Sequence, residues 1–405
     1  MCPLTPGIAD FGETGECMSD PVIVGWAHAP FGKHEDKDAE ALVAEVARKA
    51  IEDAGLQPAD IDGVFVGMFN NGMAKQDFPS SLVLQSVPEL RFTPMTRCEN
   101  ACASGSAAIH AGRNFIRAGN GRTVLVIGVE KMTGSSTQSV GDALLGASYR
   151  REEGNVPAGF AGVFARMADA YFQCYGDQSE ALAHIAAKNH RNGVDNPFAQ
   201  MRKDLGYEFC NTVSERNPIV AGPLRRTDCS PISDGAAAIV MTTGDDMARF
   251  PRAVRFRAAI HVNDHMPLSK RDLHRLEGAS EAWNRALGAA NLEISDLSFV
   301  EVHDCFTIAE LLAYEAMGLT APGKGAHAVL EGWTDARGRL PVNRSGGLKA
   351  KGHPVGATGV SMHVLSAMQL VGEAGALQLP RAGLAGVFNM GGSGVANYVS
   401  ILEAV

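Results

Sequence analysis

The segment around Cys102 combines a thiol with surroundings that suit a nucleophile. Cys102 lies in NACASGSAA, directly before a run of small residues with helical character, and Cys98 lies four residues upstream. A helix N-terminus or a nearby imidazolium lowers the pKa of a thiol from about 8.5 and so favours the reactive thiolate. Glycine and alanine beside Cys102 also leave room for an acyl group. A buried packing thiol and half of a metal site are the competing interpretations.

His303, Cys305 and His353 are the other candidate reactive residues. The segment VEVHDCFTIAE has a strand-like run that ends at His303 and Cys305, after which Thr307 begins a helix. Polar groups at the carboxyl end of a strand in an α/β sheet point into the ligand crevice. His353, in KAKGHPVGATG, precedes a proline suited to the first helical position and glycines that permit close backbone approach. Taken singly, each of the three is also compatible with simple packing.

These residues are positioned by helices and strands that alternate along the chain. Residues 38–56 and 104–119 have helical apolar spacing, whereas 60–69 and 122–132 are short runs typical of strands. This alternation predicts an α/β fold with mainly parallel strands that helices cover on both faces. The candidate reactive residues then fall at the ends of strands and at the starts of helices.

An internal duplication relates the two halves of the chain. KAIEDAGLQPADIDGVFVG, from residue 49, matches RALGAANLEISDLSFVEVH, from residue 285, at a constant offset of 236. CASGSAA from 102 matches HPVGATG from 353, and DGAAAIVMTTG matches SGVANYVSILE with Gly235 over Gly394. Two similar units are expected to pack about a pseudo-twofold axis, with equivalent helix N-termini approaching one cavity. The duplication therefore predicts that Cys102 and His353 converge.

The duplication and the loop-rich stretches predict the domain organisation. We expect a flexible N-terminal tail at 1–20, an N-terminal half at 21–132 and 234–250, an inserted loop domain at 133–233 and a C-terminal half at 251–405. The insertion is rich in Gly, Ser, Asn and charged residues, and a helix is expected in it over 180–193. A long insertion above an α/β sheet is a usual place for substrate recognition.

Composition excludes several classes of function. The chain has 405 residues, 45% of them hydrophobic, and a net charge of −9 without a basic patch, which argues against nucleic acid as a partner. We find no apolar run of transmembrane length and no secretory signal, so no membrane span is expected. Eight cysteines are too sparse for a disulfide framework, which suits a reducing compartment and a cytoplasmic location.

Three weaker patterns add little to these candidates. Cys98, Cys102, His303 and Cys305 can be drawn as a zinc site, but their spacing matches no usual zinc motif, so no metal is expected. GGSGVA lacks the helix that follows a dinucleotide-binding loop, which predicts no nicotinamide or flavin cofactor. The pair Arg225 and Arg226 fits either a phosphate contact or two solvated charges.

Four motifs in this order, NACASGSAA, HDCFTIAE, GGLKAKGHPVGATG and NMGGSGVA, resemble the thiolase superfamily, and specifically the sterol-carrier-protein type thiolases. The resemblance covers Pro21 to Val405 and implies the thiolase fold, with duplicated αβαβα layered halves and an inserted loop domain. It also implies that Cys102 carries the acyl group, that His353 takes the thiol proton and that His303 donates to a thioester oxygen.

The resemblance assigns two further roles and contains one departure. Backbone N–H groups at Cys102 and in the turn at Gly391 would form an oxyanion hole, and Cys305 would be the acid/base that moves a proton α to the carbonyl. The common thiolases use a cysteine of a C-x-G motif for that proton, whereas VFNMGGSGVA in this chain contains no cysteine. Cys305 is the replacement in the sterol-carrier-protein branch.

The sequence therefore predicts a thiolase-like acyltransferase that forms or thiolytically cleaves a 3-ketoacyl-CoA through a cysteine acyl-enzyme. The resemblance implies coenzyme A and acyl-CoA as cosubstrates, no tightly bound cofactor, and a homodimer or homotetramer. A ketoacyl synthase or retro-aldolase relative is an alternative within the fold. A non-catalytic acyl-CoA-binding scaffold that needs a small OB-fold partner is another.

Overall fold

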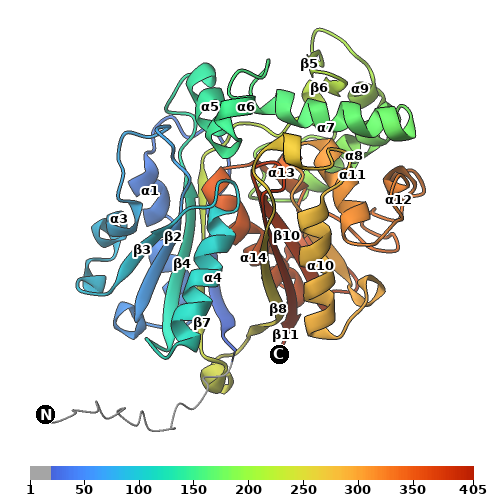
Figure 1. Ribbon diagram of the computed structural model, residues 1–405. Coiled ribbons are helices and arrows are strands. Elements are labelled where there is room, and N and C mark those ends of the chain that lie inside the picture. Colours follow the sequence, from blue (N-terminus) through green and yellow to red (C-terminus); the bar gives the residue numbers. More distant parts are fainter. Residues whose placement is uncertain (1–19) are drawn as a thin grey trace, which may run out of the picture.

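The computed structural model of the protein describes residues 20–405. The expected tail at 1–20 lies outside the described residues except for Asp20, whose carboxylate forms ion pairs with Arg113 and Arg117. Figure 1 shows two halves side by side, with the C-terminus at the end of the molecule opposite the inserted segment.

A nine-stranded sheet runs through both halves in the order β3-β2-β4-β7-β1-β8-β11-β10-β9. Its strands are β1 (Val22–His28), β2 (Gly63–Gly67), β3 (Met95–Cys98), β4 (Thr123–Glu130), β7 (Gly235–Thr242), β8 (Val254–Asn263), β9 (Phe299–Val302), β10 (Leu384–Gly391) and β11 (Ala396–Ala404). The halves meet where β1 pairs with β8 over only two residue pairs, Val22 with Arg255 and Ile23 with Val254.

The expectation of mainly parallel strands is wrong. Among the described strands of this sheet, β2–β3, β2–β4 and β9–β10 pair in parallel, whereas the other five pairings are antiparallel. Strands buried on both faces have the same continuous apolar sequence in either direction, so composition does not distinguish the two directions. The sheet is mixed, within an α/β fold.

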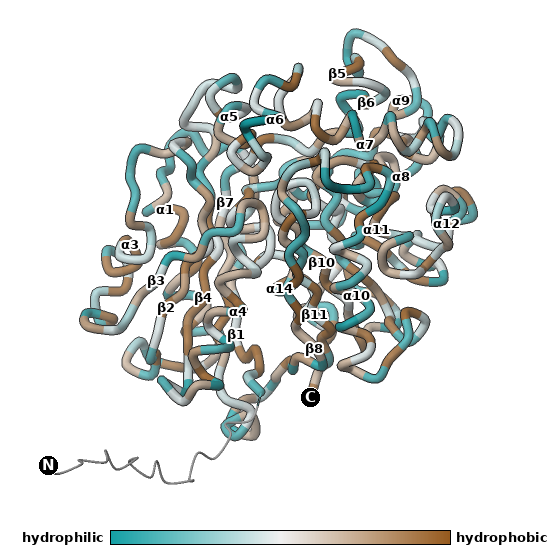
Figure 2. Tube along the Cα trace, in the orientation of Figure 1, coloured by the Kyte–Doolittle hydropathy of each residue, from teal (hydrophilic) through white to brown (hydrophobic). Residues whose placement is uncertain are grey.

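Helices cover the sheet and also separate its halves. The outer helices are α1 (Ala39–Ala44), α2 (Ala47–Asp53), α3 (Pro79–Ser86), α10 (Glu277–Ala290) and α11 (Thr307–Ala316), and the central ones are α4 (Ser104–Arg117) and α14 (Val355–Leu370). Alternate residues of β4 face two cores: Val124 and Val126 belong to one cluster, whereas Leu125 and Ile127 belong to the other. Figure 2 shows hydrophobic residues concentrated along these central strands.

The duplication is visible in the order of the elements and in local hydrogen bonds. From the outside inward, β2-β4-β7-β1 of the first half mirrors β9-β10-β11-β8 of the second. The 3₁₀ turns Pro58–Asp60 and Ile294–Asp296 match at the offset of 236, and each is closed by its aspartate accepting the N–H of the preceding cap residue. One match is shifted, because the strand pairing places Gly235 over Ala396 and not over Gly394.

The two central helices touch through backbone atoms where they start. A Cβ added to Gly105 on α4 would lie 2.7 Å from the carbonyl oxygen of Gly356 on α14. A Cβ added to Gly359 would lie 2.4 Å from the backbone nitrogen of Ser106. Only glycine permits this approach. The contact holds the beginnings of α4 and α14 together, next to Cys102 and His353.

The segment between β4 and β7 lies over one end of both halves (Figure 1). It contains α5 (Thr137–Leu144), α6 (Arg150–Glu153), α7 (Phe160–Tyr175), α8 (Ser179–Gly193), α9 (Tyr207–Asn211), β5 (Ile219–Ala221) and β6 (Leu224–Arg225). Helix α8 confirms the expected helix at 180–193, and the predicted domain boundaries stay predictions. Two further short helices, α12 (Gly325–Leu330) and α13 (Gly347–Lys351), precede His353. No helix within residues 20–405 is long and apolar enough for a membrane crossing.

Candidate active site

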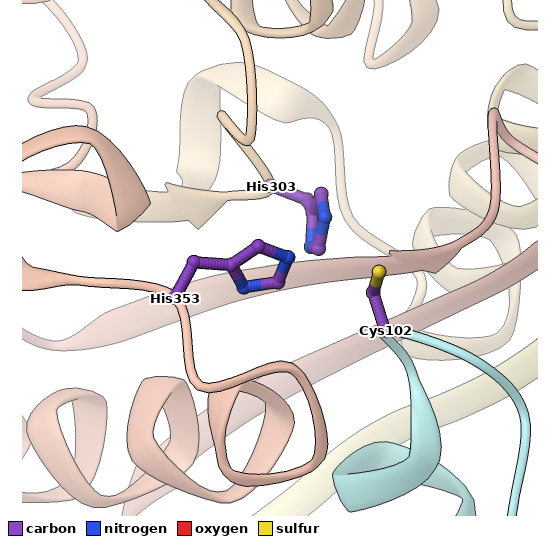
Figure 3. Close-up of side chains that lie close together, drawn as sticks. All are labelled: Cys102, His303 and His353. Atoms are coloured by element: carbon purple, nitrogen blue, oxygen red, sulfur yellow. The ribbon is translucent and has the colours of Figure 1, made fainter. Parts of the chain in front are cut away.

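Cys102, His303 and His353 converge in the interior, as Figure 3 shows. The Cys102 sulfur and one ring nitrogen of each histidine lie within 4.8 Å of one another, and all three side chains are buried. The two imidazole rings stand almost perpendicular, with their centroids 4.9 Å apart. The sequence placed these residues on three separate motifs, and the structure brings them together.

Cys102 lies in the tight turn between β3 and α4. Ala101 adopts a φ of +50°, a conformation that L-residues rarely take, and Ala103 is the residue that caps α4. The Ser104 hydroxyl donates to the Ala101 carbonyl and accepts the Asn100 N–H, which fixes the turn from within. This geometry places the Cys102 sulfur at the N-terminus of α4.

His353 precedes α14, where its ring is oriented by the first turn of that helix. Its Nδ1 lies 2.7 Å from the Thr358 hydroxyl, which in turn donates to the Pro354 carbonyl at 3.0 Å. Because the hydroxyl proton is directed at the carbonyl, Nδ1 is the donor to Thr358. Nε2 is then the unprotonated nitrogen, and it is buried without a partner among the described residues.

His303 follows the end of β9 and contacts the neighbouring strand β10. Its Nδ1 lies 2.9 Å from the Asn389 side-chain nitrogen, which also lies 3.3 Å from the Cys102 carbonyl oxygen. The His303 Nε2 is buried and has no hydrogen-bond partner among the described residues. Both histidines thus have an anchored Nδ1 and an Nε2 that is available in the site.

The turn at Gly391 and Gly392 faces Cys102. Burial raises the pKa of the Cys102 thiol, and the N–H groups of Gly392 and of Cys102 itself, which act on the sulfur and favour its anion, oppose that rise. The resemblance implied a second donor in the Gly391–Gly392 turn, and within that turn the N–H of Gly392 is the one that acts on the sulfur. A Cβ on Gly391 would lie 2.3 Å from the Asn100 carbonyl oxygen, so both glycines are needed for the turn to approach.

Burial dominates the ionisation of the Cys102–His353 pair. It raises the pKa of Cys102 to about 12, against the backbone donors, and it lowers the pKa of His353 to about 3, with a further contribution from Lys351. Any preference of the helix N-terminus for a thiolate is thus outweighed by burial at Cys102. Thiol and imidazole are both neutral at pH 7, and a proton must move when the sulfur attacks.

Cys305 lies near Cys102 but outside the three-atom cluster. Cys305 is buried, and its carbonyl oxygen accepts a hydrogen bond from the Ser230 N–H at 2.9 Å. The following residue, Phe306, forms an isolated antiparallel β-bridge with Cys229. Burial raises the pKa of Cys305 well above the usual range, and the proximity of Cys102 raises it further. A neutral Cys305 thiol can act as an acid or, after losing its proton, as a base.

A metal ion is the main chemical alternative for three such groups. Cys102, His303 and His353 are the one set of possible ligands that lies close enough together within residues 20–405, and it differs from the zinc set drawn from the sequence, which included Cys98 and Cys305. Histidine ligands in metal sites usually donate their second N–H to a carboxylate or a carbonyl oxygen. The Nδ1 of His303 instead meets the amide nitrogen of Asn389, so this histidine fits a metal site poorly.

The arginine pair is resolved in part. Arg225 is buried, and its guanidinium is used by Asp228, the Asn211 side chain and the Ser179 carbonyl. Arg225 is therefore neither a phosphate contact nor a solvated charge, because its guanidinium donors already form hydrogen bonds within the insertion. Arg226 next to it is exposed.

Two site residues could not be identified from the sequence. Asn389 lies inside the quoted motif NMGGSGVA, and Thr358 lies inside GHPVGATG, but neither carries a charge or a nucleophile that would single it out. A pocket of about 680 Å³ is lined by Asn100, Ala101, Gly391 and Gly392 among others, and its shape could not be predicted from the sequence either.

Two family models match the chain: Thiolase, N-terminal domain, over residues 21–245, and Thiolase C-terminal domain-like, over residues 261–404. The chain belongs to the thiolase family. The acetyl-CoA acetyltransferase of Methanothermobacter thermautotrophicus is 37% identical over 381 residues, which cover 93% of this chain and 97% of that relative. Sterol carrier protein 2 of Homo sapiens is 31% identical over 381 residues, which cover 89% of this chain and 67% of that relative.

Solved structures share the fold. The structure of the Ltp2-ChsH2(DUF35) aldolase superposes with a TM-score of 0.81 at 19% identity and covers 96% of this chain and 98% of its own. The Acat5 thiolase from Ascaris suum, in complex with coenzyme A, has a TM-score of 0.71 at 17% identity and covers 96% of this chain and 100% of its own. The predicted thiolase fold is confirmed by these comparisons and the family models together.

Proposed function

We propose that this protein is an acyltransferase of the thiolase type, which forms or thiolytically cleaves a 3-ketoacyl-CoA through an acyl group on Cys102. The observation that supports the proposal most directly is the convergence of the Cys102 sulfur with a free Nε2 of His353, under two backbone N–H donors. Such an arrangement is suited to a covalent intermediate, because nucleophile, base and oxyanion donors are all present.

Acylation follows from the neutral state of the pair. The Cys102 sulfur attacks the thioester carbonyl while its proton passes to Nε2 of His353, which carries a lone pair because Nδ1 donates to Thr358. A new sulfur–carbon bond forms and the bond to the coenzyme A sulfur breaks. The leaving thiolate takes the proton back from His353. The N–H groups of Cys102 and Gly392 stabilise the oxyanion of the tetrahedral intermediate.

Carbon–carbon bond chemistry requires a second proton transfer and a second oxyanion site. The Cys305 thiol would pass its proton to Nε2 of His353, which is free again once coenzyme A has left, and the resulting thiolate would remove a proton from the carbon α to the thioester of the second substrate. His303 would stabilise the enolate oxygen by donating from Nε2. The nucleophilic carbon then attacks the acyl group on Cys102, and the Cys102 sulfur leaves as the carbon–carbon bond forms and takes the proton held by His353. Thiolysis is the same sequence in reverse.

Coenzyme A esters are the proposed substrates. The relatives at 37% and 35% identity are named acetyl-CoA acetyltransferases, and the Ascaris suum thiolase was crystallised with coenzyme A. A homodimer or homotetramer stays a prediction, as does a small OB-fold partner. One similar structure, the Ltp2-ChsH2(DUF35) aldolase, names a second component, so a candidate partner is a useful addition to the assay if the chain alone is inactive.

Intact-protein mass after brief exposure to acyl-CoA and 3-ketoacyl-CoA thioesters tests the proposal. We expect an acyl adduct on the Cys102 peptide that added coenzyme A removes. Cys102→Ala should lose the adduct entirely, whereas Cys98→Ala, which changes a thiol four residues away, should retain it. Absence of an adduct from folded wild-type protein across the panel, with and without an OB-fold partner, would contradict the proposed acyltransferase.

Cys305→Ala separates the two thiols. Acylation of Cys102 should persist, because it needs only His353 and the backbone donors, while condensation and thiolysis should fall by about 10²–10⁴-fold, the usual contribution of a general acid or base. Cys210→Ala, a buried thiol on α9 in the insertion, is the matched control and should retain both steps. Loss of acylation together with condensation in Cys305→Ala would mean that the two thiols do not divide the reaction.

A further inference from the structure

Asn389 joins three parts of the site through one side chain. It lies on β10, fully buried, and its amide nitrogen lies 3.3 Å from the Cys102 carbonyl oxygen and 2.9 Å from Nδ1 of His303. Its amide oxygen accepts a hydrogen bond from the Ser106 hydroxyl on α4 at 2.8 Å. One residue therefore connects the turn that carries the sulfur, the helix behind it and the histidine opposite.

The neighbours of Asn389 fix which way its amide group points. The Cys102 carbonyl can only accept a hydrogen bond, so the amide nitrogen, and not the oxygen, must face it. The reverse orientation would place two oxygens against each other in a buried site and would remove the acceptor of the Ser106 hydroxyl. The same nitrogen is thereby the atom that faces His303.

The orientation of the amide determines the tautomer of His303. An NH₂ group can only donate, so Nδ1 of His303 must accept and carries no proton. In the neutral ring the proton then resides on Nε2, the nitrogen that is buried in the site without a partner among the described residues. His303 is held as an N–H donor toward the reacting atoms.

His353, whose ring centroid lies 4.9 Å away, is held in the opposite tautomer. Its Nδ1 meets the Thr358 oxygen, an acceptor, so its Nε2 carries the lone pair. Two identical side chains thus present a donor and an acceptor to one cavity. Their difference arises from what stands behind each ring: an amide nitrogen in one case and a hydroxyl oxygen in the other.

The geometry points to Asn389 as a positioning residue that keeps His303 protonated at Nε2 and so keeps it an oxyanion donor in place of a base. The inference rests on the proposed function for its catalytic consequence, but the tautomer itself is a property of the unliganded protein. Without Asn389 the proton is free to move to Nδ1. The lone pair of Nε2 would then face the developing negative charge and repel it.

Nitrogen NMR of the wild-type protein tests the tautomer directly. In protein labelled with ¹⁵N-histidine, two-bond and three-bond ¹H–¹⁵N correlations show which ring nitrogen bears the proton, and the His303 signals are those missing from His303→Gln. We expect a protonated Nε2 and an unprotonated Nδ1 near neutral pH. A proton on Nδ1 of His303 would overturn the inference, whatever any variant does.

Asn389→Asp keeps the shape of the side chain and replaces the donor by an acceptor. The variant should move the His303 proton to Nδ1 or charge the ring, which the same spectra detect. Turnover should fall by about 10²-fold, the usual effect of one oxyanion donor, with KM within about threefold of wild type. Asn389→Ala, which removes the donor without adding an acceptor, should leave a mixture of tautomers and a smaller loss of turnover.

Asn196→Asp is the matched control. Asn196 is a fully buried asparagine whose amide donates to the Ser345 carbonyl and accepts the Phe198 N–H, outside the site. It should lose stability without changing the His303 tautomer or kcat. Equal kcat losses in Asn196→Asp and Asn389→Asp, or an Asn389→Asp variant with wild-type kcat, would contradict the inference.

Failure of the proposed function has a different signature. Wild-type protein that shows the expected His303 tautomer but no acyl adduct on Cys102 would contradict the acyltransferase and leave the role of Asn389 in fixing the tautomer standing. Wild-type protein that is acylated and turns over, with His303 protonated on Nδ1, would do the reverse.

Discussion

The two halves of the molecule contain equivalent pairs of parallel strands, but different residues lie at the ends of the two pairs. In the first half β2 and β4 pair in parallel, and their last pair is Gly67 with Gly128. In the second half β9 and β10 follow the same register, which continues past their last pair, Val302 and Phe388, to His303 beside Asn389. One fold therefore ends in two glycines on one side of the pseudo-twofold axis and in two polar side chains on the other.

The glycines of the first half provide space, and the second half uses it. A Cβ on Gly67 would lie 2.5 Å from the Ser104 carbonyl oxygen, and one on Gly128 would lie 2.8 Å from that of Gly356. Because glycine has no Cβ atom, the starts of α4 and α14 can contact the ends of these strands directly. The duplicated fold thus has one site, because only one strand pair contributes side chains and the other positions the helices.

Among the variants that probe this comparison, His303→Ala should have the largest effect, because it removes the polar side chain that the second half has at the end of β9. We expect condensation and thiolysis to fall by about 10²–10³-fold through loss of an oxyanion donor, while acylation of Cys102 changes much less. Initial rates and intact-protein mass measure the two steps.

His363→Gln is the control for His303→Ala. His363 is a buried histidine on α14 whose two nitrogens already bond to the Gly359 carbonyl and the Ser400 hydroxyl. It should lose stability and keep activity. A loss of condensation as large in His363→Gln as in His303→Ala would show that burial alone explains the result.

Glu130→Gln sharpens the comparison at the position where the second half has Gly391. Glu130 is buried and accepts the N–H groups of Phe69, Asn70 and Gly356, yet burial raises its pKa from 4.5 to about 7. Because the pKa of Glu130 is higher in the folded protein than in the unfolded chain, its protonated form contributes to the free energy of unfolding. This contribution is fully present below pH 4.5 and is lost as the pH rises through about 7.

The measurement is denaturant unfolding of wild type and Glu130→Gln at several pH values. Wild-type stability minus that of Glu130→Gln should decrease by about 2–3 kcal/mol between pH 5 and pH 8, because a shift of one unit corresponds to about 1.4 kcal/mol. A difference that stays constant over this range would mean that Glu130 does not titrate in it.

Gly67→Ala should have a smaller effect and bears on the first half alone. The added methyl group would meet backbone atoms of Ser104 and Gly105, so α4 must shift, at a cost of about 1–3 kcal/mol in the free energy of unfolding. The shift also moves Cys102, so acylation should slow.

Gly288→Ala is the counterpart of Gly67→Ala on α10, where an added Cβ meets nothing within 4 Å. It should be stabilising by about 0.5–1 kcal/mol, since alanine has the higher helix propensity. Thermal unfolding compares the two variants. A Gly67→Ala protein as stable and as readily acylated as Gly288→Ala would mean that close backbone contact is not what the first half contributes.

The fold was largely predictable because its signals are periodic. Apolar spacing located α4 and β4, and the repeat at an offset of 236 implied that Cys102 and His353 converge. Strand direction was not predictable, since an apolar run such as that of β7 is the same in a parallel or an antiparallel ladder. The match at Gly235 was shifted by two residues for a related reason: small apolar residues align almost as well in either register.

The sequence predicted which residues form the site better than it predicted their protonation states. A helix N-terminus favours a thiolate, but burial, which a sequence does not reveal, outweighs that effect at Cys102 and leaves a neutral thiol. The motifs identified His303 and His353 as a pair. Their opposite tautomers depend on Asn389 and Thr358, uncharged residues that become informative only when their hydrogen-bond partners are known.

The contact of Gly105 with Gly356 has a consequence for how this site can change. Backbone atoms set the spacing between the helix starts that carry Cys102 and His353, so no exchange of one side chain for another can adjust it gradually. The distance between the nucleophile and the base is therefore fixed by the backbone. Variation in the reaction has to enter through the strand ends opposite, where His303, Cys305 and Asn389 are ordinary side chains and can be replaced one at a time.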